Sequence, residues 1–329
     1  MLQGMAGAIR EKENAVLLGS RLGGRGFKRL FLVACGAPNM VMSVIEYWSK
    51  RHAKGLDVRR YFPAEFIHQD PAALDGETLV VIGSHSGTTM ETIEAARFLM
   101  DKPCTTVCIT QRPDSPLARA VQHPLVYGDC EHGYYPFFVL ILALVNAFVK
   151  GSEGWTFHEE VIASLDALPN AIADAIESVE KRAKEDALFL KDDRVLYVVG
   201  AGPMYSAAHV FGVCVLAESQ WMHVIPVVAA EFFHGAFEAV DRGVPVVILV
   251  GEDPSRPEAE RVFNFCKRFT GRLIVYDSQD FEMRGVHPKV RAIVAPHIVE
   301  AALYRLAEHL AALHGQPLST RRYMGKVDY

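Results

Sequence analysis

The chain has 329 residues, of which 50% are apolar and 22% are charged. This composition can bury a large core and excludes a disordered, collagen-like or coiled-coil chain, and the length favours about two domains. The 34 lysines and arginines against 39 aspartates and glutamates give a net charge of −5, which disfavours a general nucleic-acid binder because such proteins need a basic surface.

Short apolar runs alternate with helix-like stretches in the first half of the chain. Strands are predicted at residues 30–36, 58–62, 78–83 and 105–110, and helices up to about residue 51 and at 90–100. The strand runs are rich in β-branched residues and are bounded by turns. Strands that are apolar on both faces and joined by helices indicate parallel βαβ packing, and hence an α/β fold.

The phosphate loop, as we call residues 83–89, follows the third predicted strand and opens a helix. A helix N-terminus offers unpaired N–H groups, to which Ser84, Ser86 and Thr89 would add hydroxyl donors, while Gly87 permits a tight turn. We therefore predict a phosphate monoester site that needs no arginine. The alternative is an ordinary turn with a helix cap.

The turn after residues 30–36 would lie beside this loop in a doubly wound sheet. We therefore expect Gly36 and Ala37, together with His85, to line the substrate site. Plain turn geometry is an equally good interpretation of the glycine.

Residues 137–149 form the strongest apolar run, which is too short for a membrane span and indicates a core or interface helix. A second helix is predicted from 159 to about 184, with a break near Pro169. The N-terminal stretch has no features of a signal peptide. The six scattered cysteines fit a reducing cytoplasm and form no metal-ligand pattern, so we expect no metal and no cofactor.

The second half repeats the first. The strand-like run that ends at Gly202 is similar to the run that ends at Gly36, 166 positions earlier. The run that ends at Gly251 is similar to the run that ends at Gly83, 168 positions earlier. The agreement of the two offsets predicts two similar domains, at 1–155 and 156–329, with a further helix from about 297 to 313. Apart from Ser255, the loop after Gly251 lacks the hydroxyls of the phosphate loop, so we expect only the first domain to hold phosphate.

Glu218 lies in an otherwise apolar helical run, which should raise its pKa and suits a general base. His234 follows two aromatic residues and precedes a glycine. A buried ion pair or exposed helix face for the glutamate, and a core position for the histidine, remain open on these residues alone.

The phosphate loop resembles the signature of SIS domains, the fold of sugar isomerases that bind phosphosugars. The matching residues are Ser84, Ser86, Gly87, Thr89, Glu91 and Thr92. The resemblance implies two tandem SIS domains with doubly wound parallel sheets. Glu218 and His234 have the spacing of the catalytic pair in the isomerase half of glucosamine-6-phosphate synthase, where the glutamate moves a proton between C1 and C2 and the histidine assists ring opening. The lysines around that glutamate are missing here, which disfavours a synthase.

The segments around Glu218 and His234 are most similar to the deglycases of phosphorylated Amadori compounds. Residues 317–329, which we call the tail, resemble the tail of those enzymes, and Arg321 and Lys326 are its candidate contacts, docking over a neighbouring active site. The resemblance implies cleavage of a 6-phosphofructosyl-amino acid to glucose 6-phosphate and amino acid in a cytoplasmic homodimer or higher homo-oligomer, with no nucleic-acid or membrane partner. The alternatives are a phosphosugar isomerase or aminosugar-phosphate deaminase, and a non-catalytic phosphosugar sensor.

Overall fold

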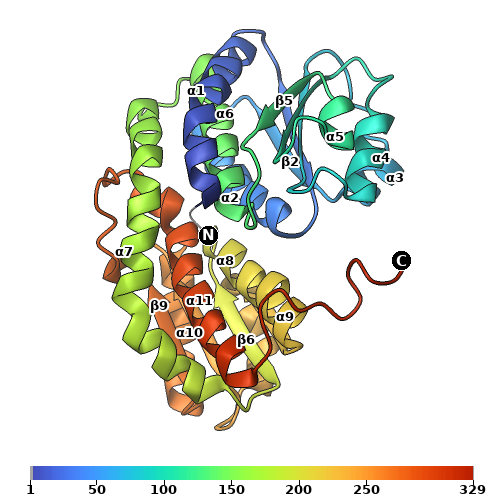
Figure 1. Ribbon diagram of the computed structural model, residues 1–329. Helices are drawn as coiled ribbons and strands as arrows, with labels where there is room; N and C mark the ends of the chain where they lie inside the picture. Colours follow the sequence, from blue (N-terminus) through green and yellow to red (C-terminus); the bar gives the residue numbers. More distant parts are fainter. Residues whose placement is uncertain (1–2, 329) are drawn as a thin grey trace. The chain divides into compact units, whose positions relative to one another are not determined.

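The structure is a computed structural model that describes residues 3–328. The chain divides into two units, Met1–Pro169 and Asn170–Tyr329, and each is described by itself. The helix α7 (His158–Leu190) begins in the first unit and ends in the second (Figure 1).

α7 corrects one prediction, because it continues through Pro169 without the expected break. A proline inside a helix removes one backbone hydrogen bond and costs about 3 kcal/mol. The apolar side chains before and after this proline, Leu165, Leu168 and Ile172, are all fully buried. Burial of this common face offsets the cost and keeps the helix whole.

In the first unit, the described residues form one five-stranded parallel sheet in the order β2-β1-β3-β4-β5. The elements are α1 (Gln3–Gly23), β1 (Arg29–Ala34), α2 (Gly36–His52), β2 (Asp57–Tyr61), α3 (Pro63–Gln69), β3 (Thr78–Gly83), α4 (Met90–Phe98), β4 (Thr105–Thr110), α5 (Pro116–Arg119), β5 (His123–Val126) and α6 (Tyr134–Glu153). Helices α3, α4 and α5 cover one face of the sheet, and α1, α2 and α6 cover the other (Figure 1).

The predicted apolar helix is α6, which at 20 residues is longer than the run at 137–149. It is long and apolar enough to cross a membrane, but 83% of its most apolar window is buried inside the protein, as in the core helix of a soluble fold. Residues 137–149 are all buried, so this run offers no apolar face to a second subunit. The expectation of a dimer therefore loses this support.

In the second unit, four described strands form a parallel sheet in the order β7-β6-β8-β9. The elements are β6 (Val195–Gly200), α8 (Met204–His209), a π-helix η1 (Val210–Ala217), α9 (Glu218–Gln220), β7 (His223–Val228), the 3₁₀ turns η2 (Ala229–His234) and η3 (Ala236–Ala239), β8 (Val246–Val250), α10 (Arg256–Phe269), β9 (Leu273–Asp277), a 3₁₀ turn η4 (Ser278–Asp280) and α11 (Arg291–His314).

The two sheets share one topology. The order β7-β6-β8-β9 reproduces β2-β1-β3-β4, and each second strand in the chain pairs at the edge beside the first. This confirms the predicted fold class of two tandem α/β units with parallel sheets. The repeat at 166 and 168 positions therefore reflects a repeated fold.

Candidate active site

The phosphate loop is held open by hydrogen bonds among its own hydroxyls. The Ser84 hydroxyl accepts from the Gly87 N–H at 3.1 Å and shares a hydrogen bond with Thr89 at 3.0 Å. The Ser86 hydroxyl accepts from the Thr88 N–H at 3.2 Å. Ser84 is only 4% exposed, whereas Ser86 and Thr89 are half-buried. Ser84 thus shapes the loop, and the other two hydroxyls are accessible to a ligand.

The loop passes directly into α4. Thr89 is the residue before the helix, and its side chain forms no capping bond within the described residues. The first N–H groups of α4 are therefore available to an anion. Gly87 has φ +66°, and a Cβ added there would lie 2.5 Å from the Ser115 side chain, so this turn requires glycine.

The other two predicted substrate residues lie at the same edge of the sheet. Ala34 of β1 and Gly83 of β3 are in register, so Gly36 and Ala37, the first residues of α2, leave the sheet beside the phosphate loop. The Cys35 thiol lies 4.0 Å from the Thr92 hydroxyl on α4, which joins the two loops.

The His85 side chain packs against Tyr127 within the first unit. Its ring is stacked on Tyr127 at 6.0 Å, and its Nδ1 atom forms a 2.7 Å hydrogen bond with the Tyr127 hydroxyl. Burial, reinforced by nearby His132, lowers the pKa of His85. A neutral, packed imidazole is suited to supporting the loop from within.

Glu218 follows an unusual helical segment. The π-helix η1 lies between α8 and α9, so the helical path from Met204 to Gln220 is wider and underwound just before the glutamate. Such π turns are rare and occur often at functional sites. Trp221 then ends the segment in the left-handed region, with φ 56°, a conformation that few non-glycine residues adopt.

A pocket of about 360 Å³ lies over Glu218. It is lined by residues 217, 218 and 221–223 and by tail residues 321–324. The Arg321 guanidinium lies 3.2 Å from the Glu218 carboxylate, and both side chains are about three-quarters buried. Burial raises the pKa of Glu218, and the charge of Arg321 acts in the opposite direction. Glu218 therefore forms a partly buried ion pair with Arg321, which is one of the two alternatives left open by the sequence.

The chain just before the tail is fixed to the Glu218 segment, and the tail itself adds a contact. The Gln220 side-chain amide donates to the Gln316 carbonyl at 2.8 Å, and Gln316 donates back to the Ser219 carbonyl. His314 shares a 2.9 Å hydrogen bond with Gln220, and Arg322 lies 4.0 Å from the centre of the Trp221 ring. Residues 321–324 of the tail thus line the pocket over Glu218 of their own chain, and docking of the tail over a neighbouring site stays a prediction.

Lys326 does not reach the pocket. Its ammonium donates to the Arg321 carbonyl at 2.6 Å and so closes a turn of the tail. Tyr329, the last residue of the tail, lies outside the described residues.

His234 is not brought to Glu218. It is an exposed residue at the end of η2, outside the pocket lining, and within residues 3–328 it forms no hydrogen bond. A position in the core is therefore wrong for this histidine. The strand β7 separates the two residues along the chain.

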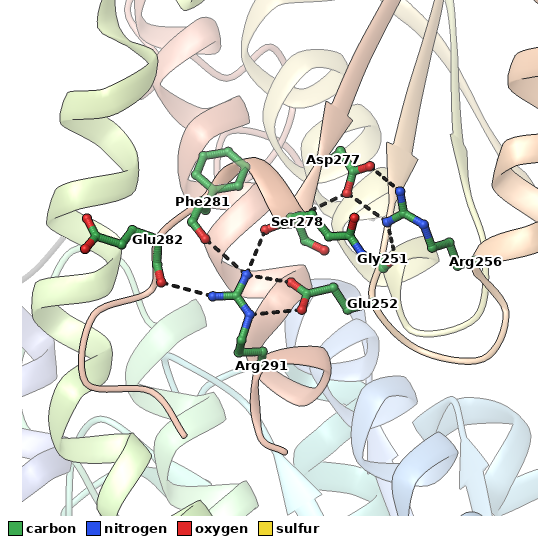
Figure 2. Close-up of polar contacts among 9 residues, drawn as sticks. Gly251, Glu252, Arg256, Asp277, Ser278, Phe281, Glu282 and Arg291 are labelled. Carbon is green, nitrogen blue, oxygen red and sulfur yellow. Dashed lines mark hydrogen bonds and ion pairs between the residues drawn. The ribbon is translucent and has the colours of Figure 1, made fainter. Parts of the chain in front are cut away.

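In the second unit, the place of the phosphate loop is taken by ion pairs (Figure 2). Arg291 donates two 2.9 Å hydrogen bonds to the Glu252 carboxylate. Arg256 likewise donates two hydrogen bonds to the carboxylate of Asp277, at the end of β9. The backbone N–H and hydroxyl of Ser255 both donate to the Asp253 carboxylate, at 3.0 and 2.7 Å. The protein's own carboxylates therefore occupy this loop, in keeping with its lack of phosphate-loop hydroxyls.

No cluster of three or more histidine, cysteine or acidic side chains with metal-binding geometry occurs in the part of the chain that the structure describes. The candidate chemistry rests on a carboxylate, an imidazole and hydroxyl donors. Sequence reasoning missed the contribution of Gln220, Gln316 and Trp221, and only the resemblance of the tail gave a signal for Arg321.

Comparison with known proteins gives a consistent result. Residues 26–149 match the SIS domain family. The chain is 33% identical to the fructosamine deglycase FrlB of Bacillus subtilis over 94% of both chains. It is 32% identical to an agropine synthesis conjugase of Rhizobium rhizogenes, covering 91% of this chain and 87% of that protein. It is 28% identical to the fructoselysine 6-phosphate deglycase of Escherichia coli, covering 92% and 86%.

Among solved structures, a proposed phosphosugar isomerase from Bacillus subtilis superposes with a TM-score of 0.91. The two chains are 32% identical, and the superposition covers all of both.

Proposed function

The chain belongs to the SIS-domain family, and on that premise we propose that it is a cytoplasmic deglycase of 6-phosphofructosyl-amino acids. The observation that carries the proposal is the buried carboxylate of Glu218 in a pocket with Arg321. A base of this kind, together with a loop suited to phosphate, matches the chemistry named in two of its relatives.

The phosphate loop binds the 6-phosphate through Ser86, Thr89 and the first N–H groups of α4. Ring opening exposes the C2 ketone, and His234 carries the proton for this step. Glu218 then takes a proton from C1 to give an enaminol, and protonation at C2 gives an imine between C1 and the amine nitrogen. Water adds to the imine and releases glucose 6-phosphate and the free amino acid.

The proposal is tested by supplying a panel of 6-phosphofructosyl-amino acids and measuring glucose 6-phosphate in a coupled assay. Turnover of the panel, with little or none of glucosamine 6-phosphate, is the expected result. Turnover of glucosamine 6-phosphate alone would establish a deaminase instead. Thermal stabilisation by phosphosugars without any product would establish a sensor.

The reverse reaction is a second candidate because one relative is named a conjugase. A conjugase forms a bond of the kind that a deglycase breaks, and each proton transfer in the scheme is reversible. Incubation with glucose 6-phosphate and excess amino acid, followed by mass spectrometry, measures this direction. Net conjugate formation under conditions where the panel is not cleaved would favour the conjugase.

Removal of the Ser86 hydroxyl is expected to weaken phosphate binding. The Ser86→Ala variant loses one hydrogen bond to a charged group, so KM should rise about 10-fold or more with kcat little changed. Ser178→Ala, which removes a hydroxyl bonded to the Ala175 carbonyl in α7, is the matched control and should leave both constants unchanged. A fall in kcat with an unchanged KM would contradict the role of Ser86.

The pH dependence of kcat/KM is expected to report on Glu218. The carboxylate must be ionised to accept a proton, so kcat/KM falls as the pH drops through its pKa. Since burial raises that pKa, the acid limb lies above the range of an ordinary glutamate. Arg321→Ala removes the opposing charge and should move the limb to still higher pH.

The substrate phosphate titrates near pH 6 and adds to the acid limb in every variant, so the shift between the two profiles isolates Glu218. The other charged or titratable side chains at the pocket, His223, Arg322 and Tyr323, are the same in both proteins. A limb that stays in place in Arg321→Ala would separate the activity from this ion pair.

A further inference from the structure

Arg321 is held as a receptor for a carboxylate. Its Nη1 atom donates to the carbonyls of Leu318 and Thr320, each at 2.8 Å, and its Nη2 atom faces Glu218 at 3.2 Å. Two backbone acceptors thus fix the guanidinium plane while one edge points into the pocket. A planar, fixed guanidinium is the side chain best suited to bind a carboxylate through two hydrogen bonds.

The second arginine of the tail is differently placed. The guanidinium of Arg322 lies 4.0 Å from the centre of the Trp221 ring, where it forms a cation–π contact. Arg321 is therefore the cation that faces the reacting carboxylate, and its partner there is Glu218.

The proposed substrate brings a second carboxylate to this position. In a sugar joined to an α-amino nitrogen, the C1 atom, the nitrogen, the α-carbon and the carboxylate carbon follow one another. Three bonds place that carboxylate within about 4 Å of C1. When Glu218 approaches the C1 proton, the substrate carboxylate comes within reach of the guanidinium beside it.

We infer that Arg321 binds the carboxylate of the substrate and so selects sugar phosphates joined to amino acids through the α-nitrogen. This inference rests on the proposed deglycase function. In the free protein the Arg321 guanidinium pairs with the Glu218 carboxylate. In the complex it binds the carboxylate of the substrate instead. An amino acid joined through a distant side-chain amine would not present its carboxylate at Arg321.

The exchange also explains how a base paired with an arginine is made ready to act. Arg321 opposes the effect of burial on the pKa of Glu218. When the substrate carboxylate takes over the guanidinium, that opposing influence weakens, and the buried carboxylate becomes a stronger base. A substrate with a carboxylate at this position thereby increases the basicity of Glu218.

The experiment compares two conjugates that differ only in the carboxylate, 6-phosphofructosyl-alanine and 6-phosphofructosyl-ethylamine. The wild-type protein should prefer the alanine conjugate by about 10- to 100-fold in kcat/KM, as expected for a hydrogen bond between charged groups. Arg321→Ala should lose this preference, because the carboxylate of the alanine conjugate then has no guanidinium to bind. Arg321→Lys, which keeps the charge without the planar fork, should retain part of it.

All variants are assayed at the same pH, and circular dichroism shows whether Arg321→Ala is folded. Arg284→Ala removes an exposed arginine paired with Asp174 and should keep the wild-type preference. No preference in the wild type, or an equal loss on both conjugates in Arg321→Ala, overturns the role of Arg321 while the deglycase function stands. Release of glucose 6-phosphate from neither conjugate overturns both.

Discussion

Glu218→Gln is expected to lower kcat by about 10²–10⁴-fold, the usual contribution of a general base, with KM raised little or not at all. Glutamine has the shape of glutamate but cannot accept the C1 proton. The pocket and the tail that covers it should persist, because the Gln220 and Gln316 contacts do not involve this carboxylate. Steady-state release of glucose 6-phosphate measures kcat, and calorimetry with the inactive variant measures substrate binding.

The ion pair adds a second expectation for this variant. Arg321 loses its partner in Glu218→Gln and is free for the carboxylate of the substrate, so the dissociation constant of an amino acid conjugate should not rise. Glu238→Gln, at an exposed glutamate in η3, is the control and should retain wild-type kinetics. Turnover of Glu218→Gln close to that of the wild type would remove Glu218 from the mechanism.

Gly19→Ala is expected to destabilise the first unit by about 3 kcal/mol, at the upper end of the usual cost of overpacking. On helix propensity alone the change should stabilise α1 by up to about 1 kcal/mol. An added Cβ, however, would lie 2.2 Å from the Leu144 carbonyl oxygen and 3.0 Å from the Ala147 Cβ. These groups belong to the buried helix α6, so α1 would have to move away from it. Propensity and packing thus predict opposite signs.

Unfolding in urea, followed by tryptophan fluorescence, measures this effect. Trp48 and Trp155 lie in the first unit and Trp221 in the second, so a Trp221→Phe background makes the signal specific to the first unit. Gly24→Ala, where an added Cβ meets nothing within 4 Å, is the control. Equal midpoints for the two glycine variants would show that α1 is not closely packed on α6.

Most strands could be predicted from the sequence, and the edge strands β5 and β7 could not. The strands β1, β3, β4, β6 and β8 were predicted because both their faces are apolar in continuous runs, and the edge strand β2 was predicted at residues 58–62. The edge strands β5 and β7 were missed. Each contains a proline, Pro124 or Pro226, and has a mixed pattern of exposure. A strand with one unpaired edge can carry such residues, so its pattern does not stand out from a loop.

Helix α1 was missed for a related reason. Its contact with α6 depends on glycines such as Gly19, where the absence of a side chain allows the helices to touch. Hydrophobic periodicity depends on apolar side chains, so it gives no signal for a helix surface formed by glycines. The π-helix before Glu218 was missed as well, since its apolar run is compatible with an ordinary helix.

Of the candidate site, the parts that are local in sequence could be predicted. The phosphate loop follows its strand and opens its helix as expected, and burial raises the pKa of Glu218 as its apolar neighbours suggest. The pairing with Arg321 joins residues 103 positions apart, so no local pattern encodes it. Whether Glu218 and His234 act as a pair stays a prediction.

The ion pairs in the loop after β8 make the two corresponding loops differ. In the second unit, Glu252, Asp253 and Asp277 already accept the hydrogen bonds of Arg291, Ser255 and Arg256. This loop therefore carries its counterions within its own sequence. We expect the phosphate loop of the first unit to take its anion from a ligand instead, and such a ligand would stabilise that unit in proportion to RT ln(1 + [L]/Kd).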